Sequence, residues 1–197
     1  MTSRRRRQPS TKPPARGGLR LPVSAESVET PAQLPAKRVR QSQVEMVEVV
    51  LPNHANPLGN ILGGRVMHLI DIAAAIAAHR HSNSYVVTAS VDHVDFRTPI
   101  RVGDLIVLKS SVNRAFRTSM EVGVKVFGEN VLTGERKHTS SAYVTFVAID
   151  AQGQPRPVRP AICETPAERR RFEEAGIRRK WRLTHRYKKL TPEEVRL

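Results

Sequence analysis

Apolar and polar residues alternate along several parts of the chain, which is the period-two pattern of half-buried β-strands. The alternation is clearest from Thr118 to Phe127. The same pattern predicts four further strands, over Val44–Leu51, Tyr85–Asp92, Asp104–Val112 and Lys137–Ile149. Turn-forming residues at Leu132–Glu135 and Asp150–Gly153 separate or end these segments.

A long apolar segment from Val66 to Ala78 interrupts the strands after the first one. It has the length of a helix and is apolar on nearly every side, which predicts a helix surrounded by other structure. Gly63 and Gly64 open it, after a loop over residues 53–60 that is rich in turn formers. Three basic residues suited to the negative end of the helix dipole close it: His79, Arg80 and His81.

A second, strongly charged helix is predicted from Pro166 to Lys189. Its charged residues are expected on solvated faces: Glu168, Arg169, Arg170, Arg171, Glu173 and Glu174.

The element order is therefore one strand, a buried helix and four consecutive strands. Consecutive strands joined by short turns form a largely antiparallel sheet. A helix wrapped by one such sheet is the hotdog arrangement. We therefore expect an α+β hotdog fold, an antiparallel sheet around one long buried helix, with an additional C-terminal helix.

Charge divides the chain of 197 residues into three parts. The formal net charge is +15, of which residues 1–40 carry +8 and residues 151–197 carry +7, so residues 41–150 are neutral overall. We therefore expect a disordered, basic, Pro-rich arm over residues 1–40, a hotdog domain over 41–155 and a basic helical extension over 156–197.

Composition also narrows partners and location. Basicity confined to the ends, together with few aromatic residues, argues against nucleic acid as the main partner. The single cysteine, Cys163, permits no intramolecular disulfide and favours a cytoplasmic location. No apolar stretch reaches the roughly 18 residues of a membrane span, so no membrane insertion is expected. The N-terminus lacks the apolar region of a secretory signal, and its prolines disfavour the helix of an organellar transit peptide.

Common catalytic motifs are absent from the sequence: it has no G-x-S-x-G elbow, no phosphate-binding Gly-rich loop and no H-E-x-x-H. His79 and His81 lie two apart on the predicted helix and cannot share a metal. We expect neither a metal nor a cofactor, and we interpret the histidines as structural or surface residues. His54 differs from the others in its position, because it lies in the loop before the helix.

Asp71 is the residue that most indicates chemistry, because it lies in the most apolar stretch of the chain. A carboxylate there costs several kcal/mol unless it is paired or hydrated. A structural aspartate is the alternative. Three features favour catalysis: Gly63 and Gly64 leave backbone N–H groups free for an oxyanion, small alanines leave room for a ligand, and Asn56 can both donate and accept a hydrogen bond.

Helix geometry adds a constraint on these groups. Gly64 and Asp71 are seven residues apart, so they return to one face of the helix about 10 Å from each other. Groups that far apart cannot both contact one carbonyl. Two antiparallel helices from two chains can supply Gly64 from one and Asp71 from the other, which predicts an obligate dimer with composite sites.

The span LPNHANPLGNILGGRVMHLIDIAAAIAAHRH, followed by VVTASVDHVDFRTPIRVGDLI, RAFRTSMEVGVKV and LTG, resembles the hotdog acyl-CoA thioesterases. The most similar are the cytosolic acyl-coenzyme A hydrolases, the brown-fat-inducible thioesterase and their bacterial relatives. The likeness covers about residues 42–150. It places the family's loop asparagine on Asn56 and its helix carboxylate on Asp71, acting together across a subunit interface, and it implies a hexamer of three dimers.

The resemblance also implies a set of coenzyme contacts. They are Gly63, Thr88, Ala89, Ser90 and Val91, then Thr118, Ser119 and Met120, and finally Arg179 and Lys180 for the coenzyme phosphates. A solvated face is the alternative for the last two. No cofactor is implied, since coenzyme A is part of the substrate.

The sequence thus predicts hydrolysis of an acyl-CoA to coenzyme A and a carboxylate. Asp71 acts as general base or nucleophile, Asn56 orients the water or the carbonyl, and the Gly64 N–H binds the oxyanion. The alternative from another class is a hotdog sensor that binds acyl-CoA or a nucleotide without turnover. A dehydratase on the same fold is disfavoured, because Leu62 stands where a catalytic histidine is expected.

Overall fold

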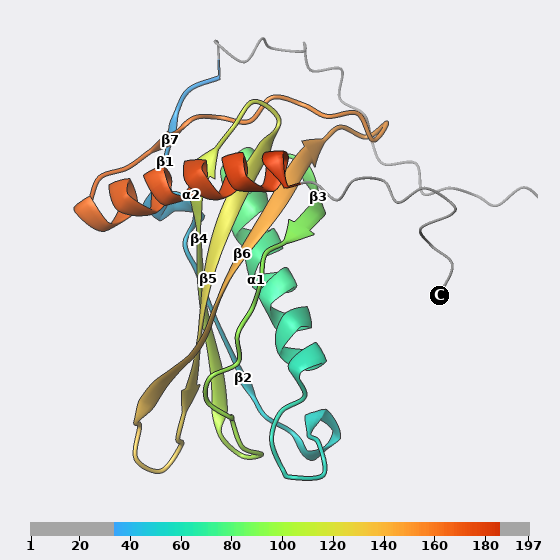
Figure 1. Cartoon of the computed structure of the whole chain (residues 1–197), viewed down its shortest axis with the longest axis vertical. Helices are drawn as coiled ribbons and strands as arrows, with labels where there is room; N and C mark the ends of the chain where they lie inside the picture. Colours follow the sequence, from blue (N-terminus) through green and yellow to red (C-terminus); the bar gives the residue numbers. More distant parts are fainter. Residues whose placement is uncertain (1–33, 186–197) are drawn as a thin grey trace, which may run out of the picture.

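A computed structural model describes residues 34–185. Its main sheet has five strands in the order β2-β4-β5-β6-β3, and every neighbouring pair is antiparallel (Figure 1). The strands are β2 Val44–Val49, β3 Tyr85–Val91, β4 Leu105–Ala115, β5 Ser119–Glu129 and β6 Arg136–Ile149. The predicted disorder of residues 1–33 and the predicted helical residues 186–189 lie outside the described part.

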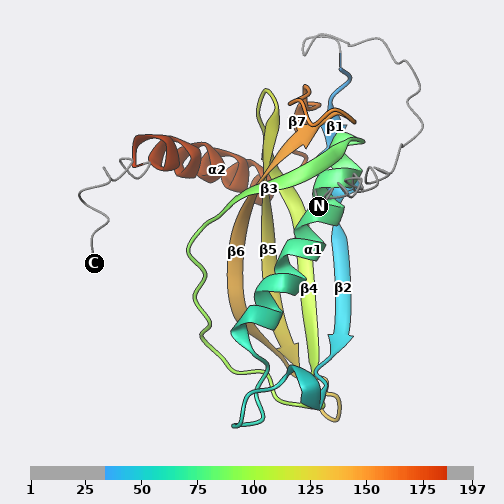
Figure 2. The ribbon, with the colours of Figure 1, turned by 90° about the vertical axis from the view of Figure 1, so that its right-hand side faces the viewer.

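The sheet curls around helix α1 (Gly63–Ser82), as Figure 2 shows. The inward side chains of β4, β5 and β6 form the core with one face of the helix, and Ala73, Ala74, Ala77 and Ala78 are fully buried there. Ser110 of β4 donates to the Ala73 carbonyl at 2.7 Å, which fixes the helix on the sheet. The predicted α+β hotdog fold is confirmed.

Within one chain, however, the sheet covers only one side of α1. Met67 is 44% exposed and Ile72 is 36% exposed. The prediction of a helix enclosed on every side was therefore wrong for a single chain, because one curled sheet covers only one side of the helix. An apolar face of α1 stays open, and Asp71 lies half-buried on it.

The strand order also differs from four consecutive neighbours. Strand β3 pairs with β6 at the edge of the sheet and not with β4. Residues 92–104 therefore form a long connection across the sheet in place of a short turn. The register of β3 on β6 shifts between Thr88 and Ser90, so Ala89 is the extra residue of a β-bulge.

The folded part begins before residue 41, where the domain boundary was predicted. Strand β1 (Lys37–Arg38) pairs in parallel with β7 (Ala161–Ile162), and the 3-10 helix η2 (Val39–Ser42) follows it. Ser42 is buried, donates to the Val39 carbonyl and accepts from Val112 N–H of β4. The apolar Val39 is 1% exposed, and its burial offsets the conformational entropy that η2 loses on folding.

Helix α2 (Pro166–Thr184) lies on the outer face of the sheet, opposite α1 (Figure 1). It ends five residues earlier than predicted, at a C-cap on His185. Glu168 was expected on a solvated face but is 5% exposed, because its carboxylate closes a capping box with Thr165. Over residues 34–185, no helix combines the length and the apolarity that crossing a membrane requires.

The C-terminal end of α1 separates its two histidines as expected. His79 is exposed, and its Nδ1 contacts the Ser84 carbonyl, whereas His81 is fully buried with Nε2 on the Arg159 carbonyl. Burial lowers the pKa of His81, which the bond to the Arg159 carbonyl only partly offsets. His81 is therefore neutral and does not supply the positive charge that was predicted for it.

Candidate active site

Asp71 projects from the open face of α1 toward strand β3. Thr88 Oγ1 donates a hydrogen bond to Asp71 Oδ1 at 2.7 Å. No other hydrogen bond or ion pair to this carboxylate occurs within residues 34–185, so Oδ2 is available to a ligand or water. Thr88 thus orients the carboxylate without neutralising it, a role that spacing along the sequence did not reveal. The bulge at Ala89 directly follows Thr88 in β3.

Asn56 organises the loop before α1. Its Oδ1 accepts from the backbone N–H groups of Leu58 (3.0 Å) and Asn60 (3.2 Å). These two donors fix the orientation of the amide, and they occupy its oxygen. Asn56 can therefore donate through Nδ2 but cannot also accept, which corrects the expectation that its amide does both.

A cavity of about 290 Å³ lies at the start of α1. Asn56, Gly63, Val66, Phe96 and Thr139 are among its lining residues, and Asp71 is not. The loop asparagine and the first glycine of the helix are thus brought together by the structure.

The N-terminus of α1 presents free backbone donors. Leu62, the N-cap residue, has no side-chain acceptor, and the N–H groups of Arg65 and Val66 bond to its carbonyl. The N–H groups of Gly63 and Gly64 find no acceptor in the described part of the chain. Gly64 is exposed, and a Cβ on it would meet nothing within 4 Å, so there is room for a ligand beside this residue at the positive end of the helix.

One chain therefore carries two separate half-sites. Asn56 and the glycine N–H groups lie at the start of α1, whereas Asp71 and Thr88 lie two turns further along, about 10 Å away by helix geometry. The structure brings each pair together but leaves the pairs apart. The composite dimer site stays a prediction.

The predicted coenzyme contacts are placed unequally. In β3, Ala89 and Val91 are exposed and Ser90 is half-buried. Met120 is fully buried with its side chain in the core, so one chain exposes no part of it to a coenzyme. Ser119 accepts a hydrogen bond from Arg179 Nη1 at 3.1 Å, which ties the β4–β5 turn to α2.

Two arginines without carboxylate partners lie beside this turn. The Arg179 guanidinium stacks on Phe116 at 4.2 Å, and that of Arg114 stacks on Phe172 at 4.2 Å. Neither forms an ion pair within residues 34–185. Burial and the neighbouring charges of Arg182 and Arg114 lower the pKa of Arg179. Two stacked cations that repel each other are suited to bind an anion. Of the two, Arg179 was predicted from the sequence and Arg114 was not. Lys180 is exposed and turned to solvent.

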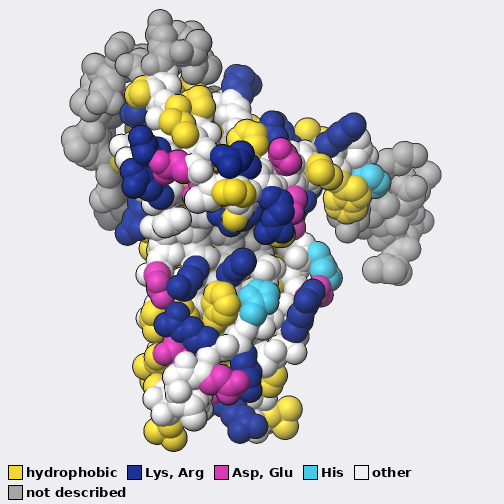
Figure 3. All heavy atoms as spheres, turned by 90° about the vertical axis from the view of Figure 1, so that its left-hand side faces the viewer, with side chains coloured by type: hydrophobic (Ala, Val, Ile, Leu, Met, Phe, Trp, Pro, Cys, Tyr) yellow, Lys and Arg dark blue, Asp and Glu magenta, His cyan; other side chains and the backbone are white. Residues whose placement is uncertain are grey.

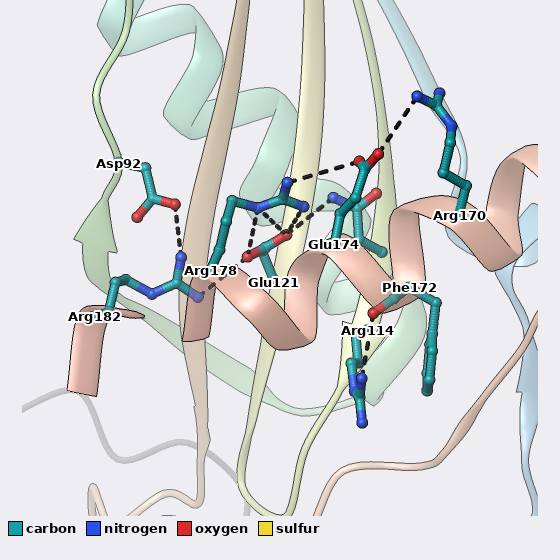
Figure 4. A network of polar contacts seen from close by, with 9 residues as sticks. Asp92, Arg114, Glu121, Arg170, Phe172, Glu174, Arg178 and Arg182 are labelled. Atoms are coloured by element: carbon teal, nitrogen blue, oxygen red, sulfur yellow. Dashed lines mark hydrogen bonds and ion pairs between the residues drawn. The ribbon is translucent and has the colours of Figure 1, made fainter. Parts of the chain in front are cut away.

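A buried charge network joins α2 to the sheet (Figure 4). Glu121 of β5 is fully buried and accepts from Arg178 Nη2 at 2.7 Å, Arg182 Nη2 at 3.1 Å and Asn113 Nδ2 at 3.2 Å. Arg182 also contacts Asp92, just after β3, at 2.6 Å. The alternation along β5 correctly predicted that Glu121 points away from the core, but it did not predict that α2 covers this side of the sheet.

The relatives of the chain were identified by sequence. A thioesterase superfamily model matches residues 58–135. An uncharacterised acyl-CoA thioester hydrolase of Bacillus subtilis, YkhA, is 41% identical over 129 residues, which cover 66% of this chain and 75% of that protein. The chain belongs to the thioesterase superfamily. Mouse acyl-coenzyme A thioesterase 11 is 43% identical over 157 residues, but the present chain matches only 26% of the length of the mouse protein.

Solved structures of superfamily members share the fold. A hexameric acyl-CoA thioesterase in its apo form has a TM-score of 0.76 and 42% identity, over 78% of this chain and 99% of that one. The acyl-CoA hydrolase of Staphylococcus aureus, solved with butyryl coenzyme A, coenzyme A and coenzyme A disulfide, has a TM-score of 0.73 and 34% identity over 77% and 93%.

Further structures of the Staphylococcus aureus hydrolase carry alanine in place of one asparagine, one aspartate or one threonine. In that chain the asparagine precedes the aspartate by 15 residues, and the aspartate precedes the threonine by 17. Asn56, Asp71 and Thr88 have the same two spacings. The residues that dominate the two half-sites of this chain therefore have the spacing of the three residues substituted in that hydrolase.

Proposed function

We propose that the protein hydrolyses acyl-CoA thioesters to coenzyme A and a free carboxylate. The observation that carries this proposal is the Asp71–Thr88 pair on the open face of α1. Together with Asn56 it repeats the spacing of the residues substituted in the Staphylococcus aureus acyl-CoA hydrolase. The names of the relatives support the same reaction.

Each residue has a defined part in the proposed mechanism. Asp71 Oδ2 removes a proton from water, while Thr88 holds Oδ1 and so fixes the direction of the carboxylate. The water attacks the thioester carbonyl, and the oxyanion that forms accepts from the Gly64 N–H at the helix start. Collapse of this intermediate breaks the C–S bond, and the proton taken up by Asp71 passes to the leaving thiolate of coenzyme A. Asn56 donates through Nδ2 to the carbonyl or to the water, because its oxygen is occupied by the loop. Direct attack by Asp71 as a nucleophile is the variant of this mechanism that the geometry leaves open.

The two half-sites are completed by a second chain in this proposal. The surface for it is the open apolar face of α1, with Met67 and Ile72, together with the outer edge of β3, which pairs with no other strand of residues 34–185. Two antiparallel α1 helices place Asp71 of one chain beside Gly64 and Asn56 of the other. The hexameric assembly of a solved relative supports a hexamer built from such dimers.

The coenzyme part of the substrate extends from Gly63 along β3 and the β4–β5 turn. Arg179 and Arg114, both without a carboxylate partner in the described residues, are proposed to bind coenzyme phosphates. Lys180 adds charge from the solvent side of α2. The cytoplasm is the proposed location, in keeping with the name of a mouse relative, the cytosolic acyl coenzyme A thioester hydrolase, which is 36% identical over 138 residues.

Replacement of Asp71 by Asn tests the function. The variant keeps the shape of the side chain and loses the base, so we expect turnover to fall by about 10²–10⁴-fold with the oligomer size unchanged. Release of free thiol from acyl-CoAs of graded chain length measures it. Glu135→Gln, an exposed carboxylate on the β5–β6 turn, is the matched control and keeps full activity. Near-normal hydrolysis by Asp71→Asn would refute the assignment, and coenzyme binding without any turnover in the unmutated protein would favour the sensor.

A further inference from the structure

Helix α2 is oriented opposite to an ordinary surface helix. The side chains that it turns toward the sheet include Arg178 and Arg182, which the buried Glu121 neutralises (Figure 4). The side chains that it turns away include Ile177, 70% exposed, and Trp181, 61% exposed. Amphipathic helices normally bury the apolar stripe and expose the charges. The inversion leaves an apolar stripe on the outer face of α2.

Specific contacts hold the helix in this inverted orientation. Arg178 stacks on Tyr143 at 3.6 Å and also binds Glu121. Burial alone would lower the pKa of Arg178, but the hydrogen bond to Glu121 outweighs this effect and raises it. Rotation of α2 to bury Ile177 and Trp181 would leave Glu121 without its cations inside the protein. The apolar stripe is therefore held outward by the buried charges.

Basic residues surround the stripe. Figure 3 shows lysine and arginine side chains gathered over the upper part of this face, with apolar side chains between them. On α2 itself the exposed charges are Arg169, Arg170 and Lys180 against Glu173.

We propose that the outer face of α2, defined by Ile177, Lys180 and Trp181, binds an anionic lipid surface. Exposed cations around an indole ring and an aliphatic side chain match a negatively charged headgroup layer, where the cations meet phosphates and the apolar groups enter the interface. Helix α2 projects from the body of the molecule, so a flat surface can reach this face (Figure 2).

A second copy of the chain fits the same face less well. A symmetric pairing of α2 with α2 sets Lys180 and Arg170 of one chain against the like charges of the other. Nucleic acid would satisfy the cations, but it gives the aliphatic Ile177 no apolar environment. Both are separate outcomes of the experiment.

Trp181 reports on this face directly, because it is the single tryptophan of the chain. The full-length protein is titrated with vesicles of phosphatidylserine and phosphatidylcholine, and with vesicles of phosphatidylcholine alone. We expect the Trp181 emission to move to shorter wavelength and to become protected from acrylamide with the anionic vesicles only. Added salt weakens binding, since each basic residue contributes about fivefold to the partition coefficient at low ionic strength.

Ile177→Ser keeps the fluorophore and removes an apolar contact, so the partition coefficient should fall by at least about fivefold. Leu132→Ser is the matched control: this leucine is 93% exposed on the β5–β6 turn, at the opposite end of the sheet, and its loss leaves binding unchanged. The readout does not involve hydrolysis, so failure of the proposed function leaves the test intact.

Each of the following results would overturn the proposal. They are no change with anionic vesicles, equal binding to pure phosphatidylcholine, equal binding by Ile177→Ser, and a spectral change with protein concentration alone, which would assign the face to self-association. An equal response to a DNA duplex would assign it to nucleic acid and would overturn the proposal as well.

Discussion

Replacement of Glu121 by Ala is the perturbation with the largest expected effect on the fold outside the apolar core. The carboxylate is fully buried, and the side chains of Arg178 and Arg182 are only 22% and 17% exposed. Truncation removes the shared anion and leaves two largely buried guanidinium groups. Breaking a buried pair in this way costs about 3–5 kcal/mol.

Each arginine keeps one other carboxylate partner in the variant, and these partners determine where between about 3 and 5 kcal/mol the loss of stability falls. Arg182 retains Asp92 at 2.6 Å, and Arg178 retains Glu174 at 3.8 Å. We therefore expect a loss near the lower end, about 3 kcal/mol, or about 6–12 °C in Tm for a chain of this size.

Urea and thermal unfolding of both proteins at one protein concentration measure this loss. Glu135→Ala is the control, because the Glu135–Lys137 pair is 61% exposed on both sides and its removal costs at most about 1 kcal/mol. A Glu121→Ala loss no larger than that of the control would refute the reasoning. A double-mutant cycle with Arg178→Met should give a coupling energy above about 1 kcal/mol, since the two residues share one contact.

The remaining predictions concern other parts of the molecule. Thr88→Val removes the hydrogen bond that orients Asp71, so kcat should fall by about tenfold or more while Tm stays within a few degrees; steady-state kinetics and a melting curve measure the two effects. Burial lowers the pKa of His81 in the folded state, so below about pH 6.5 the unfolded chain binds more protons than the folded chain. The free energy of unfolding should therefore fall as the pH decreases below about 6.5, by up to about 1.4 kcal/mol per pH unit. His81→Gln should remove this pH dependence from urea midpoints measured at several pH values. Ser42→Ala leaves the buried Val112 N–H without an acceptor and should cost about 1–3 kcal/mol in unfolding experiments.

The elements that pattern alone predicted well are those with a strong local signal. The alternation over 118–127 defined β5, and the uniformly apolar segment defined α1, because side-chain periodicity follows directly from strand and helix geometry. The neighbours of β3 were not predictable in this way. Pairing with β6 depends on a long connection whose path is set by the whole sheet.

Burial decided the other differences. Val39 lies in a segment whose prolines and charges indicate disorder, yet the contacts of η2 with α1 and β4 order it. Glu121 and Glu168 look like solvated charges, and only the position of α2 and the geometry of its first turn bury them.

The candidate site was accessible to sequence reasoning where a polar residue stood in an apolar context. Asp71 was found in this way, and the spacing from Gly64 predicted that one chain holds only half of the site. The bond from Thr88 and the fixed amide of Asn56 required coordinates, because both depend on the path of a loop or strand that is distant in sequence or irregular.

Mixed oligomers test the central claim most directly, that two chains build one acyl-CoA hydrolase site. Asn56→Asp keeps the loop acceptor and loses the donor, and Asp71→Asn loses the base, so each variant alone should be almost inactive. Random co-assembly of the two produces hybrids with one intact site, and turnover should return to about one quarter of that of the unmutated protein. Activity no higher than that of either variant alone would contradict the composite site.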